Sequence, residues 1–262
     1  MLKNIKMLLI KLGLVLVITF SIFLGGKAGN VGKVAYATSN GKGVYSTVQQ
    51  QKQMSDLKDV KDVLNNLNGT TESGIKKGSK GKVLIYSSHS NEKYINGSID
   101  LIGDDLAKKL TKKGFSVEHD ITDYAEIQGY NRSYYSSGDM LKSKNLSEYV
   151  LIIDLHCDSS SKPVSTQVKG NEVARLMFPN VSLNPNLKTE TNLVNKIKKG
   201  LDAFGGKIYR DNVTHYRTGI AMYNLQRSPN MMLMEVGCDK NDSTSCFRAN
   251  TYFSSAVAEA LK

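Results

Sequence analysis

The sequence is poor in the residues that mark several protein classes. It has no Trp, 4 Pro and only 3 Cys in 262 residues. The cysteines form no Cys-x-x-Cys pair, which argues against a zinc ribbon, and they are too few for a disulfide-rich scaffold. Because 40% of the residues are hydrophobic, the chain is also not collagen-like, mucin-like or wholly disordered. Its length suits one domain with additional segments.

Acidic residues are missing where the chain begins. Residues 1–37 contain five Lys and no Asp or Glu, and residues 38–80 contain seven Lys and four acidic residues. Of the net charge of +11, residues 81–262 therefore carry only +3. A nucleic-acid-binding protein concentrates positive charge on its folded body. We therefore expect no nucleic-acid partner.

An apolar run from Leu12 to Leu24 follows the first three lysines, a pattern typical of an export signal. Residues 7–26 supply about 20 positions, enough to cross a bilayer. Ala35-Tyr36-Ala37 matches the small-residue motif of a cleavage site. We expect residues 1–37 to be an uncleaved membrane anchor or a signal peptide cleaved after Ala37; a buried core helix is the third alternative. Either of the first two places the rest of the chain outside the cytoplasm.

Residues 38–81 are rich in small and polar residues and contain no strand-like run. Apolar residues recur every three to four positions over residues 46–67, which predicts one amphipathic helix. We interpret this segment as a helical tether.

Residues 82–262 form the predicted catalytic domain, in which apolar strand-like runs alternate with helical patterns. This order predicts an α/β fold with a mostly parallel open sheet and helices on both faces. The predicted strands span residues 82–86, 115–118, 149–155, 173–178 and 230–236, and the predicted helices span residues 98–113, 130–144, 186–204 and 242–262.

Chemically active side chains follow three of these strands. His89 and Glu92 come after the first strand, His156 after the third and Glu235 at the end of the last. Ligands in open α/β sheets bind at the carboxyl ends of the strands. Two His and one carboxylate are a catalytic zinc set. The order therefore predicts His89, Glu92 and His156 as zinc ligands and Glu235 as the general base.

Other polar residues near these strands have open roles. Asp154 shares a strand face with His156 and is either a partner that orients its imidazole or a hydrogen-bonded sheet residue. Asp158 is similarly placed and equally undecided. His119 and His215 lie in polar surroundings, and we expect neither to be a ligand.

Six segments of residues 82–262 resemble the stage II sporulation protein P family: VLIYSSHSNEKY, YNRSYYSSGDML, LIIDLHCDSS, ARLMF, NPN and MYNLQRSPNMMLMEVG. The resemblance implies a membrane-anchored zinc N-acetylmuramoyl-L-alanine amidase that remodels peptidoglycan during engulfment. It implies the same ligands and the same catalytic carboxylate. It also suggests engulfment partners, including a lytic transglycosylase similar to stage II sporulation protein D. Cys157 stands where the family commonly has Arg, so substrate positioning is expected to differ.

Two other functions remain open on the sequence alone. A zinc carboxypeptidase or endopeptidase acting on wall stem peptides would have the same order of ligands, and a carboxypeptidase would need a cation for the terminal carboxylate. Arg175, Arg210 and Arg217 are candidates for that cation. A non-enzymatic wall-binding or scaffold protein is the third hypothesis. Cys238 and Cys246 either form a disulfide or remain free thiols.

Overall fold

The computed structural model describes residues 35–39, 42–46, 78, 80–211 and 215–262. The chain divides into two units, Met1–Asp56 and Leu57–Lys262. The predicted export segment and the predicted helix at residues 46–67 lie outside the described residues, apart from positions at their ends. Within the described part of the chain, no helix is both long and apolar enough to cross a membrane.

The described part of the first unit is a β-hairpin. Strands β1 (Ala35–Ser39) and β2 (Lys42–Ser46) pair antiparallel, with Ser39 opposite Lys42. The expectation of a tether without strands was therefore wrong. The missed signal is Asn40-Gly41, because this dipeptide between β-branched and aromatic residues strongly favours a two-residue hairpin.

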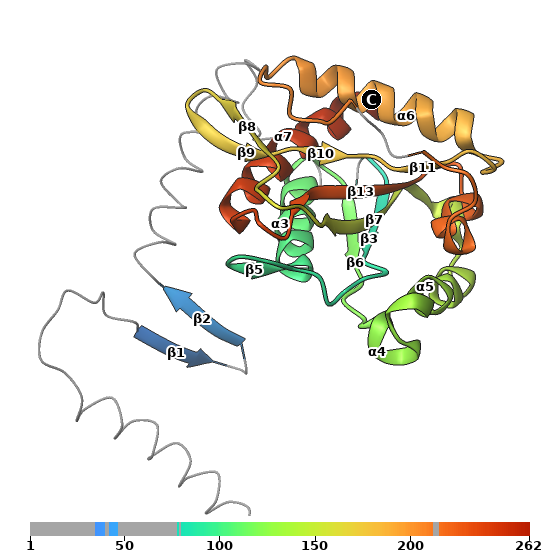
Figure 1. Cartoon of the computed structure of the whole chain (residues 1–262), viewed down its shortest axis with the longest axis horizontal. Helices are drawn as coiled ribbons and strands as arrows, with labels where there is room; N and C mark the ends of the chain where they lie inside the picture. Colours follow the sequence, from blue (N-terminus) through green and yellow to red (C-terminus); the bar gives the residue numbers. More distant parts are fainter. Residues whose placement is uncertain (1–34, 40–41, 47–77, 79, 212–214) are drawn as a thin grey trace, which may run out of the picture. The chain divides into compact units, whose positions relative to one another are not determined.

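The second unit is built on a five-stranded sheet with the order β10-β13-β7-β3-β6 (Figure 1). Neighbouring strands are parallel except for β10, which pairs antiparallel with β13 at one edge. The predicted mostly parallel sheet is confirmed. Its strands are β3 (Lys82–Tyr86), β6 (Ser116–His119), β7 (Tyr149–Asp158), β10 (Leu176–Met177) and β13 (Met231–Cys238).

The central strands are buried on both faces, which explains their nearly continuous apolar sequences. Side chains alternate between the two faces of a strand. In β3, Val83 and Ile85 belong to one hydrophobic cluster, while Leu84 and Tyr86 belong to a second.

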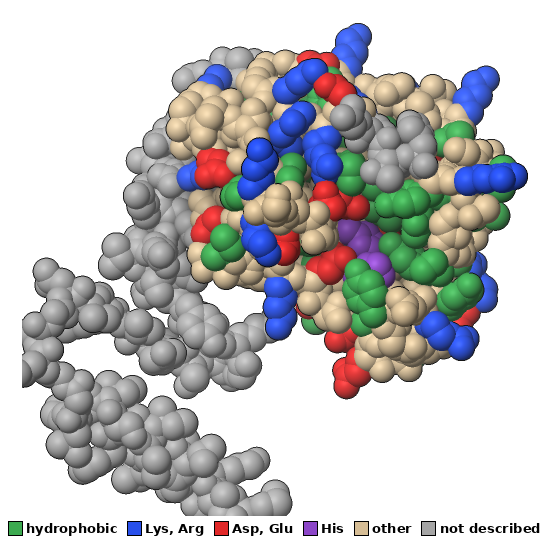
Figure 2. Space-filling model, viewed as in Figure 1, with side chains coloured by type: hydrophobic (Ala, Val, Ile, Leu, Met, Phe, Trp, Pro, Cys, Tyr) green, Lys and Arg blue, Asp and Glu red, His purple; other side chains and the backbone are tan. Residues whose placement is uncertain are grey.

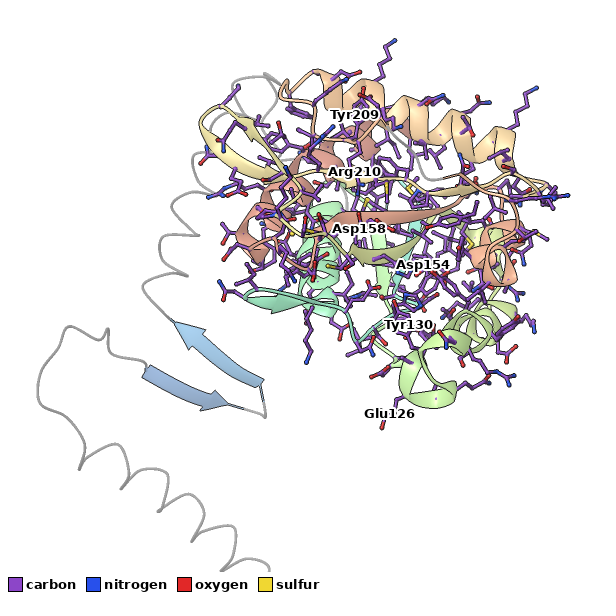
Figure 3. The ribbon with its side chains drawn as sticks, viewed as in Figure 1. Glu126, Tyr130, Asp154, Asp158, Tyr209 and Arg210 are labelled. Atoms are coloured by element: carbon purple, nitrogen blue, oxygen red, sulfur yellow. The ribbon has the colours of Figure 1, made fainter. Side chains whose placement is uncertain are left out.

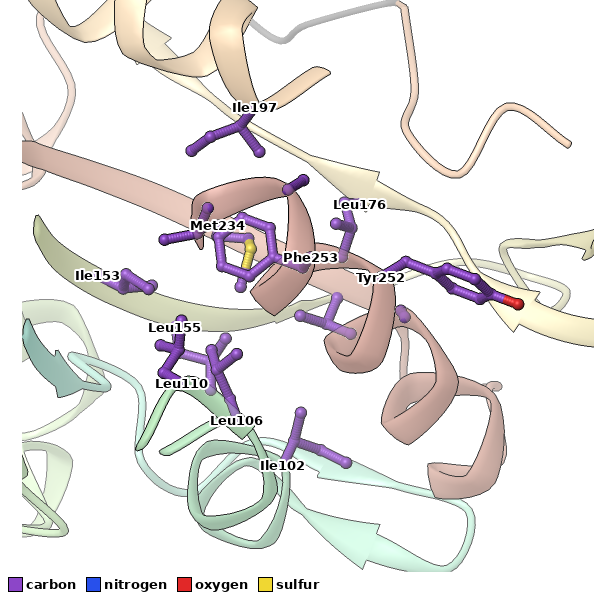
Figure 4. Close-up of a cluster of buried hydrophobic side chains, with 14 of the residues drawn as sticks. Ile102, Leu106, Leu110, Ile153, Leu155, Leu176, Ile197, Met234, Tyr252 and Phe253 are labelled. Atoms are coloured by element: carbon purple, nitrogen blue, oxygen red, sulfur yellow. The ribbon is translucent and has the colours of Figure 1, made fainter. Parts of the chain in front are cut away.

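Helices cover both faces of the sheet, as the sequence predicted. Helices α3 (Ile99–Lys112), α6 (Leu187–Asp202) and α7 (Ser243–Ala260) supply the first cluster, where Leu106, Ile197 and Phe253 pack against the sheet (Figure 4). Helices α4 (Tyr124–Gln128) and α5 (Ser133–Lys142) supply Tyr124, Tyr134 and Leu141 to the second cluster.

The long helices begin where capping residues predict. The Ser98 hydroxyl accepts a hydrogen bond from the Leu101 N–H, and the Asp242 carboxylate accepts one from the Thr244 N–H. Helix α5 is preceded by a 3₁₀ turn, η1 (Tyr130–Arg132), and α4 was not predicted. The remaining short elements are β4 (Lys93–Tyr94), β5 (Gly97–Ser98), β8 (Ser165–Val168), β9 (Asn171–Ala174), β11 (Asn180–Val181), β12 (His215–Tyr216), η2 (Leu146–Glu148) and η3 (Ile220–Arg227).

The strand predicted at residues 173–178 is two strands in the structure. Asn171–Ala174 pairs with Ser165–Val168 in a hairpin, and only Leu176–Met177 reaches the central sheet. Arg175 marks the break, since its N–H donates to Val164 O and its carbonyl accepts from the Gly237 N–H. One apolar run thus contributes strands to two different sheets. Local periodicity cannot reveal this division, because it does not indicate which strand each residue pairs with.

Glu190 on α6 provides a prediction about stability. It is 3% exposed, and burial raises the pKa of its carboxyl to about 7, although a hydrogen bond from Asn184 Nδ2 opposes this shift. The folded state binds this proton more tightly than the unfolded state, so folding stability is lost as pH rises from about 4.5 through 7. As the pH rises from 5 to 8, the free energy of unfolding of Glu190→Gln should therefore increase by about 1–3 kcal/mol relative to that of wild type. Urea unfolding measures this difference.

The control for this experiment is Glu126→Gln, which makes the same change at an exposed helical carboxyl. Its stability relative to wild type should not change appreciably with pH. A stability difference between Glu190→Gln and wild type that is constant from pH 5 to pH 8 would contradict the prediction.

Candidate metal centre

Three neighbouring strands carry the centre at their carboxyl ends. His89 and Glu92 lie in the loop after β3, His156 lies near the end of β7, and Glu235 lies in β13. His156 and Glu235 are register partners. Strands β7 and β13 both continue beyond their predicted ends, because they keep pairing as far as Asp158 and Cys238. His156 and Glu235 are therefore held by the sheet itself and not by loops.

The structure brings His89, Glu92 and His156 together. The Nδ1 atom of His89 lies 3.1 Å from Glu92 Oε1, and the Nδ1 atom of His156 lies 3.6 Å from the same oxygen. One donor atom from each of the three residues lies within 4.8 Å of the others. The side chains are 12%, 15% and 5% exposed, respectively. The cluster is therefore only slightly exposed to solvent and converges on one point.

These separations fit a zinc ion. Tetrahedral zinc with bonds of about 2.0–2.1 Å holds neighbouring ligand atoms about 3.3 Å apart. The two separations from Glu92 Oε1 lie on either side of this value. Two imidazoles and one carboxylate are also a ligand set that leaves a coordination position for a water molecule.

Asp154 holds His156 in one orientation. Asp154 Oδ1 lies 2.9 Å from His156 Nε2, so the imidazole donates its Nε2–H and leaves Nδ1 facing Glu92. Asp154 is fully buried and also accepts hydrogen bonds from the Ser88 N–H at 2.8 Å and the Ser88 hydroxyl at 2.7 Å. The carboxylate thus links β7 to the loop that carries His89.

The electrostatics of the centre favour a bound cation. Burial disfavours the Glu92 carboxylate, but His156, His89 and the Cys157 N–H together outweigh burial and lower its pKa to about 2. Burial also disfavours protonation of His156, yet Asp154 and Glu92 raise the pKa of this imidazole well above its ordinary value. Two carboxylates therefore attract positive charge to His156, and either a proton or a divalent metal ion can supply it.

Glu235 has the properties of an acid–base group. Its Oε2 atom is buried and has no hydrogen-bond partner among the described residues. Burial, with a smaller contribution from the nearby Asp158, raises the pKa of its carboxyl to about 7, although His156 opposes the shift. A carboxyl with this pKa can accept and return a proton near neutral pH.

Asp158 takes part in an ion pair at the border of the centre. Its Oδ2 atom accepts a hydrogen bond from Arg210 Nη1 at 2.5 Å. Figure 3 shows Asp158 between Arg210 and Asp154 in this view. Of the three arginines named from the sequence, Arg175 donates to the carbonyls of Lys207 and Tyr209, and no side-chain partner is seen for Arg217 among the described residues.

Two tyrosines that were not predicted as site residues contact the histidines on the other side of the centre. The ring of Tyr130 stacks on His89 with centroids 3.9 Å apart, and the ring of Tyr134 stacks on His156 at 5.9 Å. Their spacing of four in the predicted helix at residues 130–144 was the available signal, since it places both on one helix face. Figure 2 shows histidine side chains reaching the surface between acidic and hydrophobic side chains.

A left-handed turn supports this aromatic side. Residues 221–224 all have φ between +48° and +60°, although none is Gly. This conformation costs about 1–2 kcal/mol per residue. The turn places Tyr223 against Tyr134, with centroids 4.9 Å apart, and the buried Asn224 donates to the Tyr134 carbonyl at 2.9 Å. Packing and hydrogen bonds hold the turn beside the centre.

His119 lies away from the centre, where its Nδ1 atom is 3.0 Å from Asp104 Oδ1. The prediction for His215 concerns a side chain outside the described residues. Cys157, Cys238 and Cys246 are free thiols.

Comparison with known proteins gives one family match. The sequence model for stage II sporulation protein P matches residues 27–258. No curated protein matches the chain in sequence.

Solved amidase structures are similar to parts of this chain. The CwlD amidase from Clostridioides difficile, solved with the GerS lipoprotein, is 15% identical, with a TM-score of 0.45 over 69% of this chain and 98% of that one. N-acetylmuramoyl-L-alanine amidase AmiC2 of Nostoc punctiforme is 16% identical, with a TM-score of 0.41 over 70% and 96%. N-acetylmuramyl-L-alanine amidase Ami1 from Mycobacterium smegmatis is 12% identical, with a TM-score of 0.43 over 71% and 96%. These values are too low to assign a function.

Proposed function

Because the chain belongs to the stage II sporulation protein P family, we propose that it is a zinc-dependent peptidoglycan hydrolase that acts in sporulation. The family match confirms the resemblance drawn from the sequence. The bond that we propose is the amide between the lactyl group of N-acetylmuramic acid and L-alanine, which is the substrate that the family resemblance implies.

The observation that carries this proposal is the convergence of His89, Glu92 and His156 beside Glu235, whose buried Oε2 atom has no hydrogen-bond partner among the described residues. We propose the first three residues as the zinc ligands. A zinc ion held there would polarise the scissile carbonyl and lower the pKa of a water molecule. Asp154 keeps the imidazole of His156 in the tautomer that presents Nδ1.

Glu235 moves the proton in this proposal. Its carboxylate removes a proton from the attacking water and then gives that proton to the departing amine of L-alanine. A pKa of about 7 suits both steps, because the group must be a base in one and an acid in the other. Asp158 helps to keep the Glu235 pKa raised, since it places a second negative charge nearby.

We propose that the enzyme works outside the cytoplasm, attached through residues 1–37 or released by cleavage near Ala37. We also propose peptidoglycan as its binding partner, together with other engulfment proteins that include a lytic transglycosylase similar to stage II sporulation protein D. No role in nucleic-acid binding is proposed.

Digestion of purified peptidoglycan sacculi by the full chain tests the proposed bond. Mass spectrometry should find stem peptides with a new L-alanine amine, and chelation of divalent metal should stop their release. Release of single residues from stem carboxyl ends would instead support a carboxypeptidase, and cleavage within the stems an endopeptidase. A zinc-loaded, folded protein that releases nothing would support the non-enzymatic wall-binding role.

A further inference from the structure

Arg210 is held at the edge of the sheet beside the proposed catalytic group. Its N–H donates to the Leu176 carbonyl at 2.8 Å, and Tyr209 forms a bridge with Leu176. Leu176 and Met177 form β10, and Met177 is the register partner of Glu235. The backbone of Arg210 is thus fixed along the strand that borders Glu235.

The side chain of Arg210 reaches from this edge to Asp158 on β7 (Figure 3). Its Nη1 atom bonds to Asp158, and the side chain remains 27% exposed. A guanidinium has five N–H donors in a fixed fork, so one contact orients the group and leaves donors for a second carboxylate. Arg175 is not equivalent, because its Nε and Nη2 atoms donate to the Lys207 and Tyr209 carbonyls and not to a carboxylate of the centre.

The position of Asp158 relative to the metal centre follows from the geometry of strand β7. Asp158 is two residues beyond His156 in β7, so the two side chains share a face of the sheet about 7 Å apart along it. The aromatic contacts of the centre come from the other direction, since Tyr130 stacks on His89 in the loop after β3. The centre therefore has an aromatic side and an arginine side.

A stem peptide has an anionic group whose distance from the scissile amide is similar to the spacing between His156 and Asp158. Its second residue is a D-glutamate linked through its side-chain carboxyl, so that its α-carboxylate is free or amidated. One residue of extended chain spans about 3.3–3.6 Å. An α-carboxylate one residue beyond the L-alanine nitrogen therefore lies about 6–7 Å from the scissile amide.

We propose that Arg210, oriented by Asp158, binds the α-carboxylate of the second stem-peptide residue and makes the enzyme selective for stems in which this group is not amidated. This inference rests on the proposed amidase function. It gives Arg210 a role in specificity, and it places the peptide on the arginine side of the centre. Binding to the fork of Arg210 offsets the repulsion that Asp158 and Glu235 would exert on a substrate carboxylate.

Two matched substrates test the proposal with the full chain loaded with zinc. Both are glycan strands with identical tripeptide stems, except that the second residue is D-glutamate in one and D-isoglutamine in the other. Wild type should show a kcat/KM about 10–100-fold higher for the carboxylate form, as expected for a charge-assisted hydrogen bond. In Arg210→Gln the ratio should fall to about 1, and in Arg210→Lys it should be intermediate, because lysine keeps the charge without the fork.

The ratio of kcat/KM for the two substrates separates binding of the substrate carboxylate by Arg210 from indirect effects of the substitution on Glu235. Loss of Arg210 also alters the surroundings of Glu235, but this change affects both substrates equally and cancels in the ratio. Lys207→Gln is the control for net charge, since Lys207 is exposed and pairs with Asp211; its ratio should equal that of wild type.

The outcomes distinguish the inference from the proposed function. Equal kcat/KM for both substrates in wild type, or a wild-type ratio in Arg210→Gln, would overturn the inference and leave the amidase function standing. If zinc-loaded wild type cleaves neither substrate at the L-alanine amide, the proposed function is overturned and the inference with it.

Discussion

Glu235→Gln is expected to lower kcat for stem-peptide release by about 10²–10⁴-fold, the range that a general acid–base group contributes. Glutamine has nearly the same shape as glutamate but cannot accept the proton from water. The position in β13 and the register with His156 do not depend on the charge of the side chain. The variant should therefore fold and bind zinc like wild type, so the loss should appear in kcat alone. Release rates by mass spectrometry and zinc content by elemental analysis measure the two properties.

The matched control for this prediction is Glu126→Gln, which makes the same chemical change at an exposed carboxyl on α4 that Figure 3 shows pointing outward at the bottom of the view. It should retain wild-type kcat. If Glu235→Gln released peptides as fast as Glu126→Gln, Glu235 would not be the base, and the unpartnered Oε2 atom would need another explanation.

His89→Ala combined with His156→Ala is expected to lower zinc affinity more than 100-fold, beyond the loss typical when only a supporting residue is removed. Only the Glu92 carboxylate would remain of the three converging donors. Hydrolysis should fall to the level of wild type treated with a chelator. Zinc titration of the metal-free protein provides a readout independent of activity.

Two further variants distinguish loss of zinc ligands from loss of other residues in the zinc titration. His119→Ala should keep full zinc affinity, because His119 pairs with Asp104 away from the centre. Asp154→Asn should lose about 10–100-fold in affinity, because an amide can hold His156 in the wrong tautomer. A double histidine variant that binds zinc as tightly as His119→Ala would rule out the proposed ligand set.

Much of the fold could be predicted from the chain because its signals are local. The apolar run of β7 and the capping residues Ser98 and Asp242 indicated a strand and two helix starts within a residue or two. The secondary-structure predictions that were wrong also have local causes. Residues 173–178 look like one strand but serve two sheets, and the Asn-Gly hairpin lies in a segment whose composition suggested a linker.

The candidate site could likewise be predicted only in part. The convergence of His89, Glu92 and His156 could be predicted because parallel strands bring their carboxyl ends to the same side of the sheet whatever their order in the chain. The tyrosine contacts could not, because Tyr130 reaches His89 only through the packing of the segment before α5 over the loop after β3.

The sequence alone therefore determined the α/β class and the family resemblance, and it indicated His89, Glu92, His156 and Glu235 as candidate site residues, since periodicity and residue type are properties of short segments. The tertiary structure decided which nitrogen of His156 faces Glu92, why Glu235 has a raised pKa, and that Arg210 pairs with Asp158 52 positions away. These properties depend on register, burial and charge contributed by distant segments. The amount of positive charge was evident from the sequence; the placement of one arginine beside the centre required the fold.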